Sequence, residues 1–424
     1  MAIKKNQMGL IVAVSSFMPS LFYTNLIVLM LIPFLGYKNI NLKLLIVILL
    51  GATYSIMASA YFEYASYWKH VFLYFFIISG IVLISSTEVR NKRQFLEAFI
   101  KAHVYISLLE IPIQLIQFVN EYGLNAGLFL VNSSAGDVGH GTIYNSALLS
   151  YKQIISLFFV LMFPALFTKQ RVAMLFALAF SILFIGANHA ILAVIASIGI
   201  ATVLTKFNAK RAIILSVVLL LLFVVFNVLF ASQTQYVMNT FSRFDLEEFA
   251  RIRVLFDWLD IDNGFSGLQT LFTGKGLGVY GSRTSYIMSG EYLRGGEMPL
   301  LGVNMINDFK DYLLPLWNKE ITSNLYISGT YYMPFSSYTS IFMEMGLIGL
   351  IVMLLVIHWS AMISGKVIGF SGLVFVVFVS IMFFLDNFIE YPRFMLPVLI
   401  AVFYMRSLRK EFKDEYFVFS TKRS

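Results

Sequence analysis

The sequence predicts an all-α, polytopic membrane protein. Hydrophobic residues make up 59% of its 424 positions and charged residues only 13%, which is too little charge to cover the surface of a soluble protein of this length. Apolar runs of bilayer-spanning length recur along the chain, and short basic connections separate them. The chain contains no cysteine, which excludes disulfides, thiolate metal sites and cysteine nucleophiles.

The clear apolar segments are each predicted as a transmembrane helix. They are 44–62, 69–86, 95–119, 151–168, 172–186, 190–205, 212–231, 337–358, 367–385 and 393–406. The stretch 8–36 is long for one helix and short for two, and Pro19 lies near its middle.

Basic residues decide the orientation, because connections rich in Lys and Arg stay in the cytoplasm. They are Lys38, Lys43, Arg90, Lys92, Arg93, Lys169, Arg171, Lys206, Lys210, Arg211, Lys366 and the tail from Arg406. Lys4 and Lys5 join them only if 8–36 folds as a helical hairpin. We therefore predict about twelve helices with both termini inside; about eleven with an external N-terminus is the alternative. The net charge of +8 lies beside the spans, so it indicates topology and we expect no nucleic-acid partner.

Two external segments are too long to be plain connections. The chain therefore divides into helices with a short external loop at 120–150 (1–231), a large external loop (232–336), three further helices (337–406) and a cytoplasmic tail (407–424). The large loop is rich in aromatic residues, whereas disordered linkers are poor in them. We expect this loop to fold against the membrane surface.

The large loop begins with a pattern typical of a helix. Ser242 can cap it, Asp245 follows three residues later, and apolar residues continue at helical spacing. This helix carries Arg243, Arg251 and Arg253. The guanidinium fork suits phosphate oxygens; pairing with acidic residues of the same helix is the alternative.

A glycine-rich turn, "LFTGKGLGVYGSR", follows in the same loop. Gly276, Gly278 and Gly281 have the spacing of a dinucleotide-binding fingerprint, but no strand–turn–helix unit surrounds them and the loop faces outside. We therefore expect no nucleotide here. Backbone amides of such a turn, beside Lys275, can approach a phosphate closely; a plain structural turn is the alternative.

A polar stripe runs along one face of the helix predicted at 95–119. Its members are His103, Ser107, Glu110, Gln114 and Gln117, and Pro112 lies close by to bend the helix. Ionisable groups at this depth usually face a cavity or a partner. The stripe therefore predicts either a functional cavity or hydrogen bonds between helices.

Further polar side chains lie at the outer ends of the predicted helices. Asn188 and His189 occupy a short external turn, and Glu344 follows a run of hydroxyl residues that includes Tyr338. The largest cluster is Asp386, Asn387, Glu390 and Arg393. These groups predict a polar chamber that is open to the outside and rimmed with arginines and carboxylates. A lone histidine is more often structural, which is the alternative for His189.

The order of these parts resembles the O-antigen polymerase and ligase superfamily, and within it the Wzy-type polysaccharide polymerases. Arg251 and Arg253 match the arginine-bearing helix that opens the large periplasmic loop of that family. Gly274-Lys275-Gly276-Leu277-Gly278 matches its glycine turn, and Glu344-Met345-Gly346-Leu347-Ile348-Gly349 matches the start of the next helix. The resemblance implies a membrane-embedded glycosyltransferase similar to the GT-C type.

Two departures from the family pattern bear on the activity. Ligases carry a histidine just ahead of the helix, about where Phe335–Ser337 lie here, and its absence favours a polymerase over a ligase. Many members have Ser-Arg where this chain has Asn188-His189. A transporter or flippase for lipid-linked glycans is the rival from another class; the long external loop argues against it, and discontinuous helices would argue for it.

The resemblance implies transfer of a glycan from one undecaprenyl diphosphate carrier to a sugar hydroxyl of another, in the bacterial inner membrane and facing the periplasm. No metal, nucleotide or other cofactor is then needed, because cations can stabilise the departing lipid diphosphate. The implied partners are the lipid-linked donor and acceptor, membrane lipid and a chain-length-regulating co-polymerase. The predicted catalytic residues are Arg251, Arg253, Glu344 and His189. The predicted substrate-binding residues are Arg243, Arg283, Lys275, Gly276, Gly278, His140 and Tyr338.

Overall fold

The computed structural model describes 5–17, 92–122, 141–143, 146–185, 188–205, 251–253, 268–274 and 336–421, together with Ile46, Leu50 and Thr53. Within these ranges the chain is helical and contains no strand, so the all-α prediction is confirmed for them. The predicted spans 69–86 and 212–231 lie outside the described residues, as does most of 44–62.

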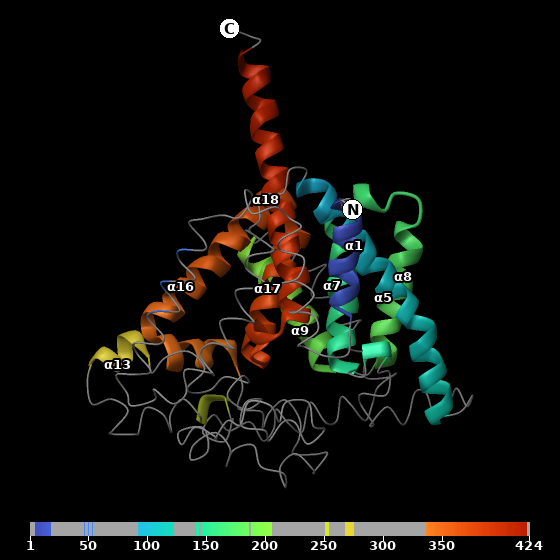
Figure 1. The fold of residues 1–424 in the computed structure, drawn as a ribbon, viewed down its shortest axis with the longest axis horizontal. Helices are drawn as coiled ribbons and strands as arrows, with labels where there is room; N and C mark the ends of the chain where they lie inside the picture. The colour runs from blue at the N-terminus through green and yellow to red at the C-terminus, as the bar shows by residue number, and fades with distance from the viewer. Residues whose placement is uncertain are drawn as a thin grey trace.

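Figure 1 shows the helices of the described part. They are α1 (Lys5–Ser15), α5 (Lys92–Tyr122), α7 (Ser146–Met162), α8 (Arg171–Ile185), α9 (Asn188–Leu204), α13 (Leu268–Thr273), α16 (Ser337–Val367), α17 (Phe370–Leu385) and α18 (Pro392–Thr421). Short 3₁₀ turns are η3 (Gly141–Ile143), η4 (Pro164–Leu166) and η8 (Phe388–Glu390). Each predicted span that is fully described overlaps one of these helices; the span 151–168 covers most of α7 and also η4, and α16 and α18 continue past their predicted ends at 358 and 406.

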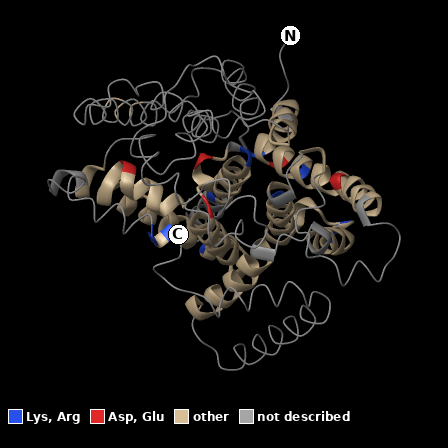
Figure 2. Cartoon of the chain, turned by 90° about the horizontal axis from the view of Figure 1, so that it is seen from below, with Lys and Arg blue, Asp and Glu red and all other residues tan. Residues whose placement is uncertain are grey.

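Two of these helices are long and apolar enough to cross a membrane. They are Arg93–Asn120, with 28 residues, and Ser337–Val367, with 31 residues. Shorter apolar helices are Leu148–Met162, Arg171–Ile182, Ala190–Leu204 and Phe370–Leu385. Figure 2 shows how sparse charged residues are on the described helices. The described residues therefore contain two candidate membrane-spanning helices, and the total helix count stays a prediction.

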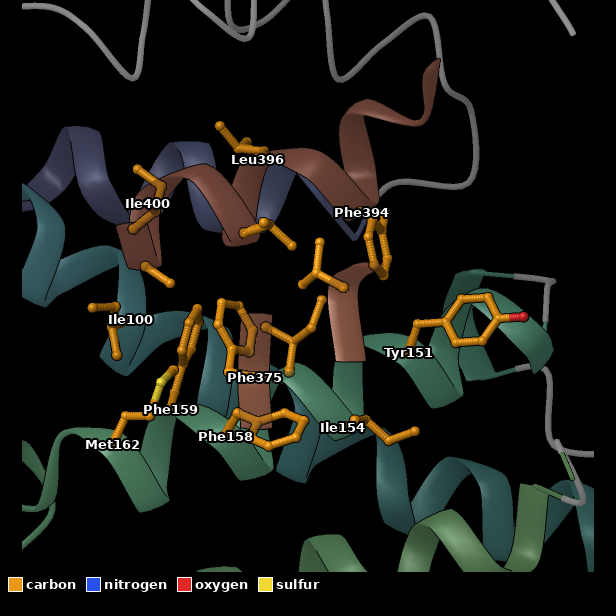
Figure 3. Close-up of a cluster of buried hydrophobic side chains, with 14 of the residues drawn as sticks. Ile100, Tyr151, Ile154, Phe158, Phe159, Met162, Phe375, Phe394, Leu396 and Ile400 are labelled. Carbon is orange, nitrogen blue, oxygen red and sulfur yellow. The ribbon is translucent and has the colours of Figure 1, made fainter. Parts of the chain in front are cut away.

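Aromatic side chains hold the centre of the bundle together. Figure 3 shows residues of α7, α17 and α18 pointing toward one another, among them Phe158, Phe375 and Phe394. The ring centroids of Phe158 and Phe375 are 5.5 Å apart at an interplanar angle of 67°, an edge-to-face arrangement that aromatic pairs prefer. Dense packing of this kind gains many small dispersion contacts, so it fixes α7 against the two C-terminal helices.

A break divides α16 into two segments. Gly346 has φ 66° and ψ −165°, a backbone region that is essentially restricted to glycine. The helix therefore runs as 337–345 and 347–367, and Figure 1 shows the two stretches meeting at an angle beside α13. This break lies two residues after Glu344, so it positions the carboxylate at the end of the first segment.

Candidate functional site

The backbone of the glycine turn at Gly274 packs directly against the backbone of the break in α16. A Cβ atom at Gly346 would collide with the backbone of Phe272 and Thr273, and a Cβ at Gly274 would collide with the carbonyl of Glu344. Gly274 also has a positive φ of 69°. The two glycines therefore serve one contact, which fixes the end of α13 against the break that follows Glu344.

Glycines such as Gly346 and Gly349 can let neighbouring helices approach closely. The structure shows such an approach at Gly346, which contacts α13. The atoms nearest to a Cβ at Gly349 belong instead to Met345 and Ile341 of α16 itself. Gly349 therefore makes room for side chains of the first segment of its own helix.

The opening residues of α16 satisfy the end of α17. The last carbonyl groups of a helix have no partner within it. Ser336 Oγ donates to Phe383 O at 3.2 Å, and the backbone N and Oγ of Ser337 donate to Asp386 O at 3.3 and 3.2 Å. Ile389 N in turn donates to Ser337 Oγ at 3.3 Å. The run of hydroxyl residues before the apolar part of α16 is thus a polar joint between two helices.

A second set of hydrogen bonds links α16 to η8, the turn that precedes α18. Asn387 Nδ2 donates to Ser340 Oγ at 3.1 Å and to Glu390 Oε1 at 2.7 Å. Arg393 follows in the first turn of α18 and is buried as well. Of the predicted cluster, Asp386, Asn387 and Glu390 are therefore hydrogen-bonded together, and Ser340 joins them.

Arg251 reaches the same region from the large loop. Its Nη2 donates to the carbonyl oxygen of Leu385, the last residue of α17, and its side chain is fully buried. A cation is favoured here because the C-terminal end of a helix carries partial negative charge. Arg253, two residues further on, is exposed. The structure thus distinguishes two arginines that the sequence treated alike.

Glu344 lies further along the first segment of α16. It is 0% exposed and lies one helical turn after Ser340 on the first segment of α16. The first segment of α16 therefore has the Arg251–Leu385 contact near its beginning and the Gly274 contact at its end. Residues that are distant in the sequence converge on nine residues of helix, 337–345.

These side chains do not line an open chamber in the structure. Glu344 and Asn387 are 0% exposed, and Glu390 and Arg393 are 6% and 7% exposed. The prediction that they rim a chamber open to the outside is therefore wrong for this conformation. Asn387 is hydrogen-bonded to Ser340 of α16 and to Glu390 of η8, which draws these two elements together.

The remaining predicted site residues are placed as follows. Tyr338 Oη donates to Ser380 O at 3.1 Å, so its hydroxyl joins α16 to α17. His189 is the second residue of α9, and its side chain lies outside the described part. Also outside the described residues are Arg243, Arg283, Lys275, Gly276, Gly278 and His140.

The polar stripe of α5 forms hydrogen bonds to neighbouring helices. His103 Nδ1 and Ser156 Oγ are 2.9 Å apart, and Ser156 Oγ donates to Ser107 Oγ at 2.7 Å. Gln153 Nε2 donates to Gln114 Oε1 at 2.9 Å. Of the two readings of the stripe, hydrogen bonding between α5 and α7 is the one that the structure shows.

Glu110 and Gln117 fasten the short external loop to α5. Glu110 accepts from the backbone N of Thr142 at 2.8 Å and from its hydroxyl. Gln117 donates to Gly141 O at 3.2 Å and accepts from Gly141 N at 2.8 Å. The C-terminal part of the stripe therefore holds η3, the turn that precedes α7.

Replacing Glu110 with glutamine should weaken this attachment. The carboxylate accepts from two donors of Thr142, and the amide can accept at only one of its two positions. We expect the free energy of unfolding to fall by about 1–3 kcal/mol, the usual worth of a buried hydrogen bond to a charged group. Thermal unfolding of the purified variant measures it.

Glu97→Gln is the matched control on the same helix. Glu97 Oε1 accepts from Arg93 Nε at 2.7 Å and from Tyr404 Oη at 3.0 Å, and an amide oxygen can keep both bonds. An exposed ion pair is worth about 1 kcal/mol or less. Equal losses in the two variants would contradict the fastening role of Glu110.

Comparison of the chain with protein-family models, with curated proteins and with solved structures found no match in any of the three. Within the described ranges no group of three or more metal-ligating side chains lies together.

Proposed function

We propose that this chain is a bacterial inner-membrane glycosyltransferase that polymerises undecaprenyl-diphosphate-linked repeat units into O-antigen or a related surface polysaccharide. The proposed architecture has about twelve transmembrane helices, similar to GT-C-type enzymes, with the site on the periplasmic side. Membrane lipid and a chain-length-regulating co-polymerase are its proposed partners. The reaction needs neither a metal ion nor a nucleotide.

One observation carries the proposal. The three parts on which the family resemblance rests are the Arg251 helix, the Gly274 turn and the Glu344–Gly349 motif of α16. Arg251 binds the end of α17, which is joined to the beginning of α16, and Gly274 contacts the backbone at Glu344. A site assembled from distant segments is what a reaction between a charged lipid carrier and a sugar hydroxyl requires.

The chemistry assigns a role to each charged group. The acceptor hydroxyl oxygen attacks the anomeric carbon of the donor, and the bond from that carbon to the diphosphate oxygen breaks. The electron pair leaves with the diphosphate, whose growing negative charge Arg251 stabilises. Glu344 orients the acceptor hydroxyl and takes its proton. Because both side chains are buried, the residues that cover them must move before the substrates bind.

Purified protein, incubated with an authentic lipid-linked repeat unit without metal or nucleotide, tests the proposal. We expect a ladder of lipid-linked oligomers on a gel. Glu344→Gln should slow its formation about 10²-fold or more, the usual loss when a general base is removed. Glu97→Gln makes the same substitution at a carboxylate of α5 that is bonded to Arg93 and Tyr404 and has no role in the proposed reaction. It should leave the ladder unchanged.

The break in α16 favours a transporter of lipid-linked glycans as a second candidate. Discontinuous helices are typical of transporter binding sites, and Gly346 interrupts a helix long enough to cross a membrane. A repeat unit that forms no ladder but reaches the opposite leaflet of proteoliposomes would replace the polymerase with this function. Transfer of the glycan once, to a lipid acceptor of another kind, would indicate a ligase.

A further inference from the structure

Lys152 is a buried lysine that the proposed reaction does not use. It lies on α7 and is 0% exposed. Its Nζ donates to Ser16 Oγ at 3.2 Å and to the carbonyl oxygen of Arg393 at 3.1 Å, and it lies 4.1 Å from the ring centroid of Phe17. Among the described residues none of these partners is a carboxylate. A buried lysine normally needs an acidic partner; the charge of Glu110 acts on Lys152 without a direct ion pair, so the contact with Arg393 requires its own explanation.

The explanation is Pro397, which lies four residues after Arg393 in α18. In an α-helix the carbonyl of residue 393 accepts a hydrogen bond from the N–H of residue 397. Residue 397 is Pro397, within α18, and proline has no N–H. The carbonyl of Arg393 thus lacks its ordinary donor in a buried position, where an unmade hydrogen bond is costly. Lys152 Nζ occupies the place of that donor.

Helix dipoles alone do not account for this arrangement. Ser16 directly follows the C-terminal end of α1, where a cation is favoured, but Arg393 lies in the first turn of α18, where a cation is disfavoured. The contact with Arg393 must therefore come from the carbonyl itself. The aromatic face of Phe17 and the hydroxyl of Ser16, which donates its own proton to Ala13 O at 2.7 Å, supply the rest of the environment.

We propose that Lys152 is a positioning residue for the candidate site, acting through the first turn of α18. That turn carries Arg393 and begins two residues after Glu390, whose carboxylate is bonded to Asn387 and through it to Ser340 of α16. By completing the hydrogen bonds of this turn, Lys152 fixes the position of η8 against α16. The positioning role rests on the proposed function, whereas the hydrogen bond that replaces the proline's missing donor does not.

A double-mutant cycle between Lys152 and Pro397 tests the inference. The four proteins are wild type, Lys152→Met, Pro397→Ala and the double variant, because alanine restores the missing N–H. We expect Lys152→Met to lower the turnover of ladder formation about tenfold with little change in the apparent KM for the repeat unit. Pro397→Ala alone should stay close to wild type, and the double variant should regain most of the lost turnover.

Thermal unfolding of the same four proteins gives a readout that needs no substrate. The loss of Tm caused by Lys152→Met should be clearly smaller in the Pro397→Ala background. If Lys152→Met folds only in that background, the coupling is supported as well. Equal losses in both backgrounds, or unfolded protein in both, would overturn it.

The two readouts separate the two proposals. Coupled Tm values in a protein that makes no ladder would overturn the proposed function, and with it the positioning role, while the Lys152–Arg393 bond would stand. Uncoupled Tm values in a protein that makes a ladder would overturn the inference alone. Full turnover in folded Lys152→Met would also overturn the positioning role.

Discussion

Gly346→Ala is expected to destabilise the protein more than any other single change considered. The backbone at Gly346, with φ 66° and ψ −165°, is a region that residues with a Cβ rarely adopt, and holding one there costs about 1–3 kcal/mol. The new Cβ would also collide with the backbone of Phe272 and Thr273, and overpacking costs a further 1–3 kcal/mol or so. We expect a total loss of about 2–6 kcal/mol in thermal or denaturant unfolding.

Gly365→Ala is the matched control, because Gly365 lies in the same helix and a Cβ there would meet no atom within 4 Å. Alanine is the better helix former by about 1 kcal/mol, so this variant should be as stable as wild type or more so. Gly274→Ala should behave like Gly346→Ala, since both glycines serve the same contact. If Gly346→Ala and Gly365→Ala unfold alike, the close contact between α13 and α16 is not present in the protein.

Arg251→Ala is expected to abolish most of the activity. Arg251 reaches the end of α17 from the large loop, and we propose that its guanidinium stabilises the departing diphosphate. Removing a donor of this kind usually costs about 10²–10³-fold in rate. Arg251→Lys keeps the charge but loses the planar fork, so its rate should fall between those of wild type and Arg251→Ala.

Arg253→Ala provides the comparison, because Arg253 is exposed and only two residues away. We expect at most a small change in its rate of ladder formation. Thermal unfolding of both variants shows whether lost activity is lost folding, since Arg251→Ala also removes the donor to Leu385 O. An Arg253→Ala variant that loses as much activity as Arg251→Ala would contradict the distinction that the structure draws between them.

The helices were predictable from the sequence because their signal is local. Apolar runs predict α5, α7, α8, α9, α16 and α17 to within a few residues at most boundaries. The boundary between α16 and α17 falls at Gly369, whose φ of 82° and ψ of −144° lie in a region that glycine adopts readily and that interrupts the helical path. The residues beyond 406 were expected to form a cytoplasmic tail, and α18 continues through them to Thr421 because no glycine or proline lies between Arg406 and Thr421.

The partners of the polar residues were not predictable, because they depend on tertiary contacts. Gly346 was part of a motif that resembles the start of a helix, but nothing local showed that the turn at Gly274 lies against it. Likewise, Pro397 and Lys152 are each unremarkable alone. Only the fold, which brings α7 against the first turn of α18, shows that Lys152 supplies the hydrogen-bond donor that Pro397 lacks.

The most direct test of the proposed function counts the lipid released during the reaction. Polymerisation frees one undecaprenyl diphosphate for every glycosidic bond that it forms, so the amount of free carrier should rise in step with the number of linkages in the ladder. Wild-type protein should show this equality without added metal or nucleotide, and folded Arg251→Ala should release almost none. Repeat units that cross the membrane with no carrier released would contradict the account.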